Sequence, residues 1–338
     1  DVYKRQLVRL SSVLGVLGFN RFLIISLLFA FVSFYGSWCF FLFFDERLKG
    51  YSFLHFLVAF LIPSCLFWTT GLLKDTLCIS FIGFILLSVQ RLLERRNVYP
   101  YFMLGTLAFC LLIVLKSYIA VCLATSLAIW LSQKTIKRSD SLVLKRSIRV
   151  LISVVLVLFL TQSNKFFGII EDQLVFNKSI SILKDYHYEY SNEEQEGASK
   201  YTLGQVEYSF AGILRATPSA LTTTLLRPYP WEVAKPLIIL MSLENLLIFS
   251  FILFSLGKLN FWTSFSKMIR NDELLLCFLF VVPFAIIVGL TSYNYGLLMR
   301  LKTPLMPFYG FALVIMYSYA NPSRRIDYFS DLFKTVRL

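Results

Sequence analysis

Long apolar runs dominate the chain, and short polar turns separate them. A run of about 20 apolar residues is long enough to cross a bilayer as a helix. The runs do not alternate polar and apolar residues as transmembrane strands do, so they predict helices. The expected fold class is all-α, a polytopic transmembrane helical bundle. We predict nine spans, near 22–44, 53–70, 72–90, 99–115, 117–132, 148–163, 236–257, 273–291 and 303–320.

Composition supports a membrane protein. Of the 338 residues, 57% are hydrophobic and 16% are charged, whereas soluble domains average about 45–50% and about 25%. This balance excludes an ordinary soluble enzyme, a disordered chain and a disulfide scaffold. The six cysteines lie within the apolar runs, which favours buried thiols. The two histidines lack the spacing of metal ligands, so no pattern supports a divalent metal or any other cofactor.

The distribution of lysine and arginine predicts the orientation of the chain in the membrane. The formal charge is +13, but membrane proteins collect cations in cytoplasmic loops, so the charge does not indicate nucleic-acid binding. Placing the basic segments inside puts the C-terminus in the cytoplasm. The chain then divides into a six-span part (1–163), an extracytoplasmic loop of about 70 residues (164–235) and a three-span part with a basic tail (236–338). The apolar flanks of the loop are expected to lie along the membrane surface.

Charged residues in the predicted outer turns are the first candidate functional residues. A charge deep in hydrocarbon costs at least about 2.5 kcal/mol, so its presence needs a reason. Lys74 and Asp75 begin a span, where the carboxylate either complements the helix dipole or faces an outer cavity. Lys116 separates two spans, and it either reaches the interface or provides a fixed cation for a phosphate.

Two further outer sites lie nearer the C-terminus. Arg300 and Lys302 occupy a side that has few cations, and an arginine there can hold phosphate oxygens. Arg227 and Glu232 flank Trp231, so this cluster is either an aromatic belt at the interface or a part of the same cavity. Cations and carboxylates around one outer surface suit a lipid-linked phosphate.

Three stretches resemble the GT-C superfamily of membrane glycosyltransferases, in its bacterial envelope type. FNRFLIISLL through PSCLFWTTGLLKDTLCISFIGFILL is similar to the second to fourth spans of the family, with Asp75 at the acidic residue that opens the fourth. LGTLAFCLLIVLKSYIAVCLATSLAIWL is similar to a hairpin of the family, with Lys116 at its lysine and Leu115 where threonine is usual. MRLKTPLMPFYGFAL is similar to the late Arg-x-x-x-Pro start of a helix, with Arg300 at the arginine.

The resemblance implies an inverting transfer of a sugar from a polyprenyl-phosphate-linked donor to an envelope glycan, lipid or protein acceptor, at the cytoplasmic membrane of a bacterium. A carboxylate would deprotonate the acceptor hydroxyl, and cations would hold the leaving phosphate. The catalytic acid of the family follows its first span. We expect that region to precede this chain, which starts with DVYKRQ and has Arg21 opening the next span. The catalytic residue is therefore unassigned, with Asp75 as a candidate.

Two other classes of protein stay open. A polysaccharide polymerase or ligase of the O-antigen type also has many spans and one large outer loop. Such a protein is expected to use more arginines than the two in this loop, Arg215 and Arg227. A transporter or flippase subunit is the non-enzymatic alternative, which internal inverted repeats would favour. The sequence contains no Walker loop or dinucleotide-binding motif.

Overall fold

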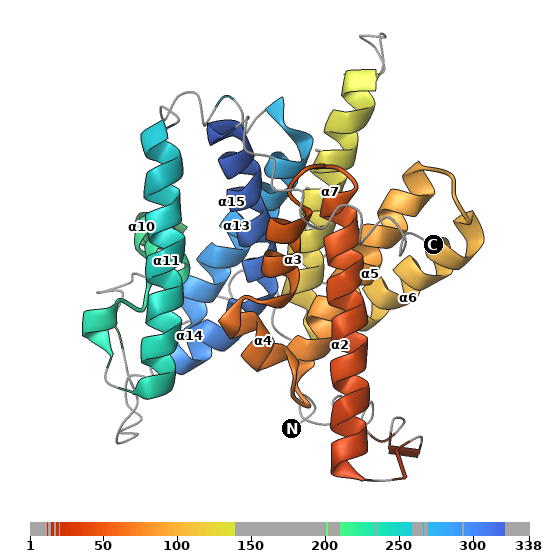
Figure 1. Cartoon of the computed structure of the whole chain (residues 1–338), viewed down its shortest axis with the longest axis horizontal. Helices are drawn as coiled ribbons and strands as arrows, with labels where there is room; N and C mark the ends of the chain where they lie inside the picture. Colours follow the sequence, from red (N-terminus) through yellow and green to blue (C-terminus); the bar gives the residue numbers. More distant parts are fainter. Residues whose placement is uncertain are drawn as a thin grey trace. The chain divides into compact units, whose positions relative to one another are not determined.

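The computed structural model describes residues 21–138, 210–258 and 270–321, apart from 234 and 293, and a few isolated positions (12, 15, 16, 18, 19, 201 and 266). The regular elements in these ranges are helical (Figure 1). They are α2 (Phe22–Asp45), α3 (Ser52–Phe60), α4 (Pro63–Thr69), α5 (Lys74–Leu93), α6 (Val98–Leu115), α7 (Ser117–Arg138), α10 (Phe210–Leu226), η1 (Pro230–Glu232), α11 (Pro236–Lys258), α13 (Asp272–Thr291), α14 (Tyr295–Leu301), η2 (Thr303–Leu305) and α15 (Met306–Ala320).

Six of the described helices are long and apolar enough to cross a bilayer: α2, α5, α6, α7, α11 and α13. They coincide with the predicted spans near 22–44, 72–90, 99–115, 117–132, 236–257 and 273–291 to within a few residues at each end. The prediction of long apolar helices is therefore confirmed for these segments, and the chain is a multi-pass membrane protein.

The other three predicted spans have different outcomes. The span 53–70 is broken, because α3 and α4 meet at a bend of 47° (Figure 1). Pro63 begins α4 and has no N–H with which to continue a helix from α3. The span 303–320 consists of η2 and the 15-residue α15. The span 148–163 and most of the loop 164–235 lie outside the described residues, so the total of about nine spans stays a prediction.

The chain forms two compact units, which are described separately. As far as their residues are described, unit 1 comprises the chain up to Ala120, 250–266 and the part from Thr303 onward. Unit 2 comprises Val121–Phe249 and Lys267–Lys302. The sequence suggests boundaries at residues 163 and 235, which divide the chain in sequence order rather than by contacts between residues. This division stays a prediction.

Unit 1 is built around α5, which is buried along most of its length and packs against α2 and α6. Small residues allow α2 and α5 to approach closely. A Cβ added to Gly36 would lie 2.2 Å from the Cα of Ser80, and one added to Gly83 would lie 2.0 Å from the carbonyl oxygen of Gly36. The ring of Phe44 stacks on Phe311 of α15 with 4.1 Å between centroids, which ties α15 to α2.

Helix α6 has a single buried stripe. Its buried residues are Ala108, Leu112 and Leu115, which are four and three positions apart and so lie on one face. Large apolar side chains elsewhere on this helix, such as Phe102 and Leu107, are exposed, as expected for a surface that faces lipid.

Unit 2 contains a helix inside the segment that the sequence assigns to the extracytoplasmic loop. This helix, α10, packs against the apolar helix α13 rather than lying alone. A Cβ on Gly289 would be 2.3 Å from the carbonyl oxygen of Ala220, and the Thr224 hydroxyl donates to the carbonyl of Ala285 at 2.8 Å. Small side chains on both helices therefore permit close packing of α10 on α13. The position of this segment along the membrane surface stays a prediction.

Candidate functional site

Asp75 and Lys116 form an ion pair in unit 1, although 41 residues separate them in the sequence. Asp75 lies in the first turn of α5, and Lys116 is the residue between α6 and α7. Lys116 has non-helical backbone angles (φ −151°, ψ 87°), so its side chain leaves the chain at a break between two helices. The side chain of Asp75 is 0% exposed and that of Lys116 is 4% exposed.

The burial of this pair has an energetic consequence. Removing two charges from water costs several kcal/mol per ion, and attraction between them offsets the cost only when they stay together. Lys74 is also buried, at 5% exposure, so the three residues carry a net charge of +1 inside apolar surroundings. Ionisable residues within the membrane are by default candidates for function, because they are costly to place there.

Arg227 and Glu232 form a second ion pair, in unit 2. Nη2 of Arg227 lies 2.5 Å from Oε1 of Glu232, and Nε lies 3.0 and 3.1 Å from the two carboxylate oxygens. Oε2 of Glu232 also accepts hydrogen bonds from the Tyr295 hydroxyl at 2.6 Å and the backbone N–H of Tyr229 at 3.1 Å. The side chains of Arg227 and Glu232 are 24% and 19% exposed, so water reaches this pair.

Two aromatic rings support the Arg227 guanidinium. Its carbon lies 5.4 Å from the ring centroid of Tyr201 and 5.8 Å from that of Tyr295, and the two rings stack at 4.9 Å. Burial raises the pKa of Glu232, but hydrogen bonds from Arg227 and Tyr295 outweigh it, so the pKa of this carboxyl is below its usual value. The hydrogen bonds to Glu232 raise the pKa of Arg227. Both groups are therefore charged near neutral pH.

Lys302 is joined to the same part of unit 2. Its Nζ is buried and donates to Oδ1 of Asn245 at 2.8 Å, and Nδ2 of Asn245 donates to the carbonyl of Arg227 at 2.8 Å. Arg300 lies in the last turn of α14, where a positive charge complements the helix dipole. The candidate lysine thus helps to fix the segment that carries Arg227.

The predicted site residues fall into two groups. Lys74, Asp75 and Lys116 belong to unit 1, whereas Arg227, Glu232, Arg300 and Lys302 belong to unit 2. The structure pairs Asp75 with Lys116 and Arg227 with Glu232. The sequence predicts that all seven residues surround one outer surface. That surface would include residues of both units, and it stays a prediction.

Sequence reasoning missed three residues that complete the second group: Tyr201, Tyr295 and Asn245. The tyrosines carry no formal charge, and nothing in their spacing predicts that they meet Arg227. Asn245 did have a signal, because it follows Glu244 within the apolar run of α11. A pair of polar residues in such a run suggests a partner in another helix.

In the parts of the chain that the structure describes, no group of three or more His, Cys, Asp or Glu side chains is arranged to hold a metal ion. His55 is buried, and its Nδ1 lies 3.2 Å from Oδ1 of Asp45. The carboxylate of Asp45 is therefore the polar partner of Nδ1 in this buried ring.

No protein-family model, no curated protein and no solved structure matches this chain. The functional assignment therefore depends on the chemistry of the two charged groups.

Proposed function

We propose that the protein is an integral-membrane glycosyltransferase that moves a sugar from a polyprenyl-phosphate-linked donor to an envelope glycan, lipid or protein acceptor. The observation that carries this proposal is the buried Asp75–Lys116 ion pair, with Lys74 next to it in sequence. The distribution of cations along the chain supports an orientation with the C-terminus inside the cell, and the resemblance to the bacterial envelope type implies the cytoplasmic membrane of a bacterium.

The chemistry of the transfer requires a cation near the leaving phosphate. The ammonium group of Lys116 is shielded from water and therefore attracts a phosphate more strongly than an exposed lysine would. Asp75 compensates this ammonium in the structure described here and holds it in place. We assign Asp75 the role of positioning Lys116, and Lys74 the role of a second cation for the phosphate.

Arg227 offers a second donor for phosphate oxygens or sugar hydroxyls. Its Nε and Nη2 are directed to Glu232. Its Nη1 makes no hydrogen bond with any residue that the structure describes, and the side chain is partly exposed. A guanidinium fixed on one side and open on the other is suited to binding an anion in a defined orientation.

A transporter is the second candidate, and one observation favours it. The predicted span 53–70 is interrupted between α3 and α4. Broken helices line the substrate sites of many secondary transporters, because non-helical backbone at membrane depth is tolerated where it lines a cavity.

A reconstituted assay tests the proposal. Purified protein in proteoliposomes would receive polyprenyl phosphate carrying a radiolabelled hexose or pentose, together with envelope lipid and glycan as acceptors. We expect covalent transfer of label with the wild-type protein, and a loss of about 100-fold with the variant Asp75→Asn/Lys116→Met, which removes both charges.

The matched control is Lys137→Met, which removes a more exposed lysine paired with Asp272 and should retain full transfer. Label that crosses the bilayer without covalent transfer would instead identify a transporter. Equal transfer by the wild-type protein and the double variant would reject the role of the Asp75–Lys116 pair.

A further inference from the structure

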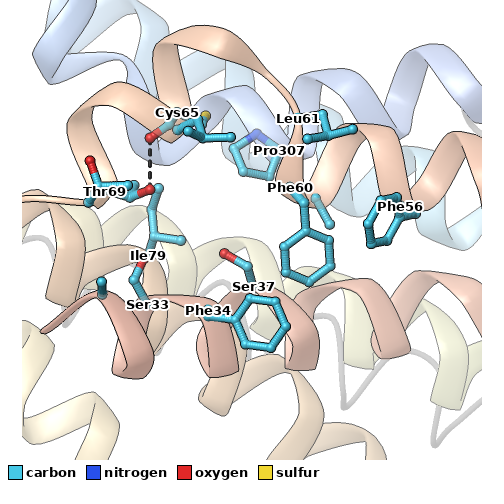
Figure 2. A pocket seen from close by; sticks show the side chains of 14 residues that line it. Ser33, Phe34, Ser37, Phe56, Phe60, Leu61, Cys65, Thr69, Ile79 and Pro307 are labelled. Atoms are coloured by element: carbon cyan, nitrogen blue, oxygen red, sulfur yellow. Dashed lines mark hydrogen bonds between the residues drawn. The ribbon is translucent and has the colours of Figure 1, made fainter. Parts of the chain in front are cut away.

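Unit 1 contains a cavity of about 290 Å³ beside the break between α3 and α4 (Figure 2). Its volume lies just below the range for ligand pockets, roughly 300–1,000 Å³. The walls are mostly apolar and include Phe56, Phe60 and Ile79. Pro307, in the first turn of α15, also lines the cavity.

The mouth of the cavity is also apolar. Phe34, Leu61 and Leu66 line the cavity and are 53%, 49% and 45% exposed. In a multi-pass membrane protein, exposed apolar side chains of this kind face lipid rather than water. A ligand that fills this cavity therefore enters from the hydrocarbon region and carries a hydrocarbon chain.

Four residues with hydroxyl groups interrupt the apolar lining: Ser33, Ser37, Thr69 and Thr70. The hydroxyls of Thr69 and Thr70 donate to backbone carbonyls of their own segment, at 2.8 Å to Cys65 and 3.3 Å to Phe67. Ser33 and Ser37 lie one helical turn apart on α2, so they share a face. Figure 2 shows the hydroxyl of Ser37 directed into the space between Phe60 and Thr69. The residue Ser33 is only 4% exposed.

These serines differ from most hydroxyls in the described helices. The Thr69 hydroxyl, for example, donates to the carbonyl of Cys65 in its own helix at 2.8 Å. Neither Ser33 nor Ser37 makes a hydrogen bond with any described residue. An unpaired hydroxyl in apolar surroundings is unfavourable, so buried polar groups normally have a partner. The cavity therefore presents two hydroxyl groups that can donate to an acceptor on a ligand.

We propose that this cavity binds an ester-linked acyl chain of a membrane glycerolipid, with Ser33 and Ser37 donating hydrogen bonds to the ester carbonyl. The chain would fill the apolar walls, and the carbonyl would supply the missing acceptor. A polyprenyl chain has no hydrogen-bond acceptor along its length and would leave both hydroxyls unpaired. The site is therefore distinct from a binding site for the proposed sugar donor, and the inference does not depend on glycosyl transfer.

The test compares two photoactivatable lipids in proteoliposomes. Both carry a diazirine in one chain, and they differ only in an ester or an ether linkage to glycerol, so only one has carbonyls. We expect the ester lipid to label peptides of α2 and α4, and the ether lipid to label the same peptides at most about one fifth as much. The reason is that a hydrogen bond of typical net strength changes affinity by about fivefold.

Variants of α2 assign the effect to the two hydroxyls. Ser33→Ala/Ser37→Ala keeps the space but removes both donors, and it should lower ester labelling to the level of the ether lipid. Ser26→Ala, on the same helix but outside the cavity lining, should change neither. Ser37→Leu should fill the cavity and block both probes, while thermal unfolding in detergent verifies that each variant is folded.

Three results would overturn the proposal. The first is equal labelling of the wild-type protein by the ester and ether lipids. The second is displacement of the label by unlabelled polyprenyl phosphate but not by unlabelled diester lipid, which would identify an isoprenoid site. The third is unchanged labelling in the folded Ser37→Leu variant, which would place the label outside the cavity.

Discussion

The two ion pairs join similar charges in different surroundings. Asp75 and Lys116 are almost completely buried, whereas Arg227 and Glu232 keep about a fifth to a quarter of their side-chain surface exposed. Glu232 also accepts hydrogen bonds from Tyr295 and from its own backbone segment. A buried charge depends on its partner, but a partly exposed charge with several donors can replace a lost partner with water. Burial therefore determines how much each pair contributes to the free energy of unfolding. We make four predictions, ordered from the most buried pair to the most exposed one.

The largest effect is expected at the buried pair. Lys116→Met removes the ammonium group that pairs with the buried carboxylate of Asp75, so we expect a loss of about 3–5 kcal/mol in the free energy of unfolding. The double variant Asp75→Asn/Lys116→Met should recover most of this loss because neither member of the pair is left as a charge without the other. Denaturant titration in detergent measures both values, and a single variant within about 1 kcal/mol of wild type would contradict the burial of the pair.

An intermediate effect is expected at the partly exposed pair. Arg227→Met leaves Glu232 with the hydrogen bonds from Tyr295 and Tyr229, and with water. We expect a loss of about 1–2 kcal/mol, measured by the same titration. Arg215→Met, at an exposed position on α10, is the matched control and should change stability little. A loss as large as that of Lys116→Met would show that exposure does not separate the two pairs.

The pH dependence of stability sharpens the same comparison. The pKa of Glu232 is lower in the folded protein than its ordinary value, which is about 4.3 for an unfolded chain. Its contribution to stability is therefore present above that value and is lost as the pH falls through the folded pKa. We expect the melting temperature of the wild-type protein to fall more than that of Glu232→Gln on acidification below about pH 4. Parallel curves for the two proteins would contradict the lowered pKa.

The smallest effect is expected at the pair between Lys137 and Asp272, in which the lysine is 46% exposed. Exposed pairs contribute about 0–1 kcal/mol. Lys137→Met should therefore lower stability by less than about 1 kcal/mol, and the difference should shrink in 1 M salt, because ions screen exposed charges. A salt-independent loss would indicate that this pair is more enclosed than its exposure suggests.

The apolar pattern of the sequence predicted much of the fold, and two segments show features that it did not predict. It placed six long helices correctly because a run of about 20 apolar residues is sufficient to define a span. It treated 53–70 as one span, although Pro63 interrupts the hydrogen bonds of a helix there. It did not predict that α10 packs against α13, which the small residues Ala220 and Gly289 allow. Local composition does not reveal which helix will present the complementary small residues.

The candidate residues show the same limit. The cost of placing charge in hydrocarbon directed attention to Asp75, Lys116, Arg227 and Glu232, and each of them has an ionic partner in the structure. Arg227 and Glu232 are five residues apart, so a turn can join them. Asp75 and Lys116 are 41 residues apart, so their pairing depends on how α5 and α6 pack.

The sequence by itself determined that the chain is apolar enough for a membrane and that a few charged residues lie where charge is costly. Both properties follow from the transfer free energy of individual residues, which does not depend on the fold. Only the tertiary structure decided which charges neutralise each other and how much water reaches them. It also placed the unpaired hydroxyls of Ser33 and Ser37 in an apolar cavity. These properties depend on distances between segments far apart in the chain, which a pattern of residues along one dimension does not contain.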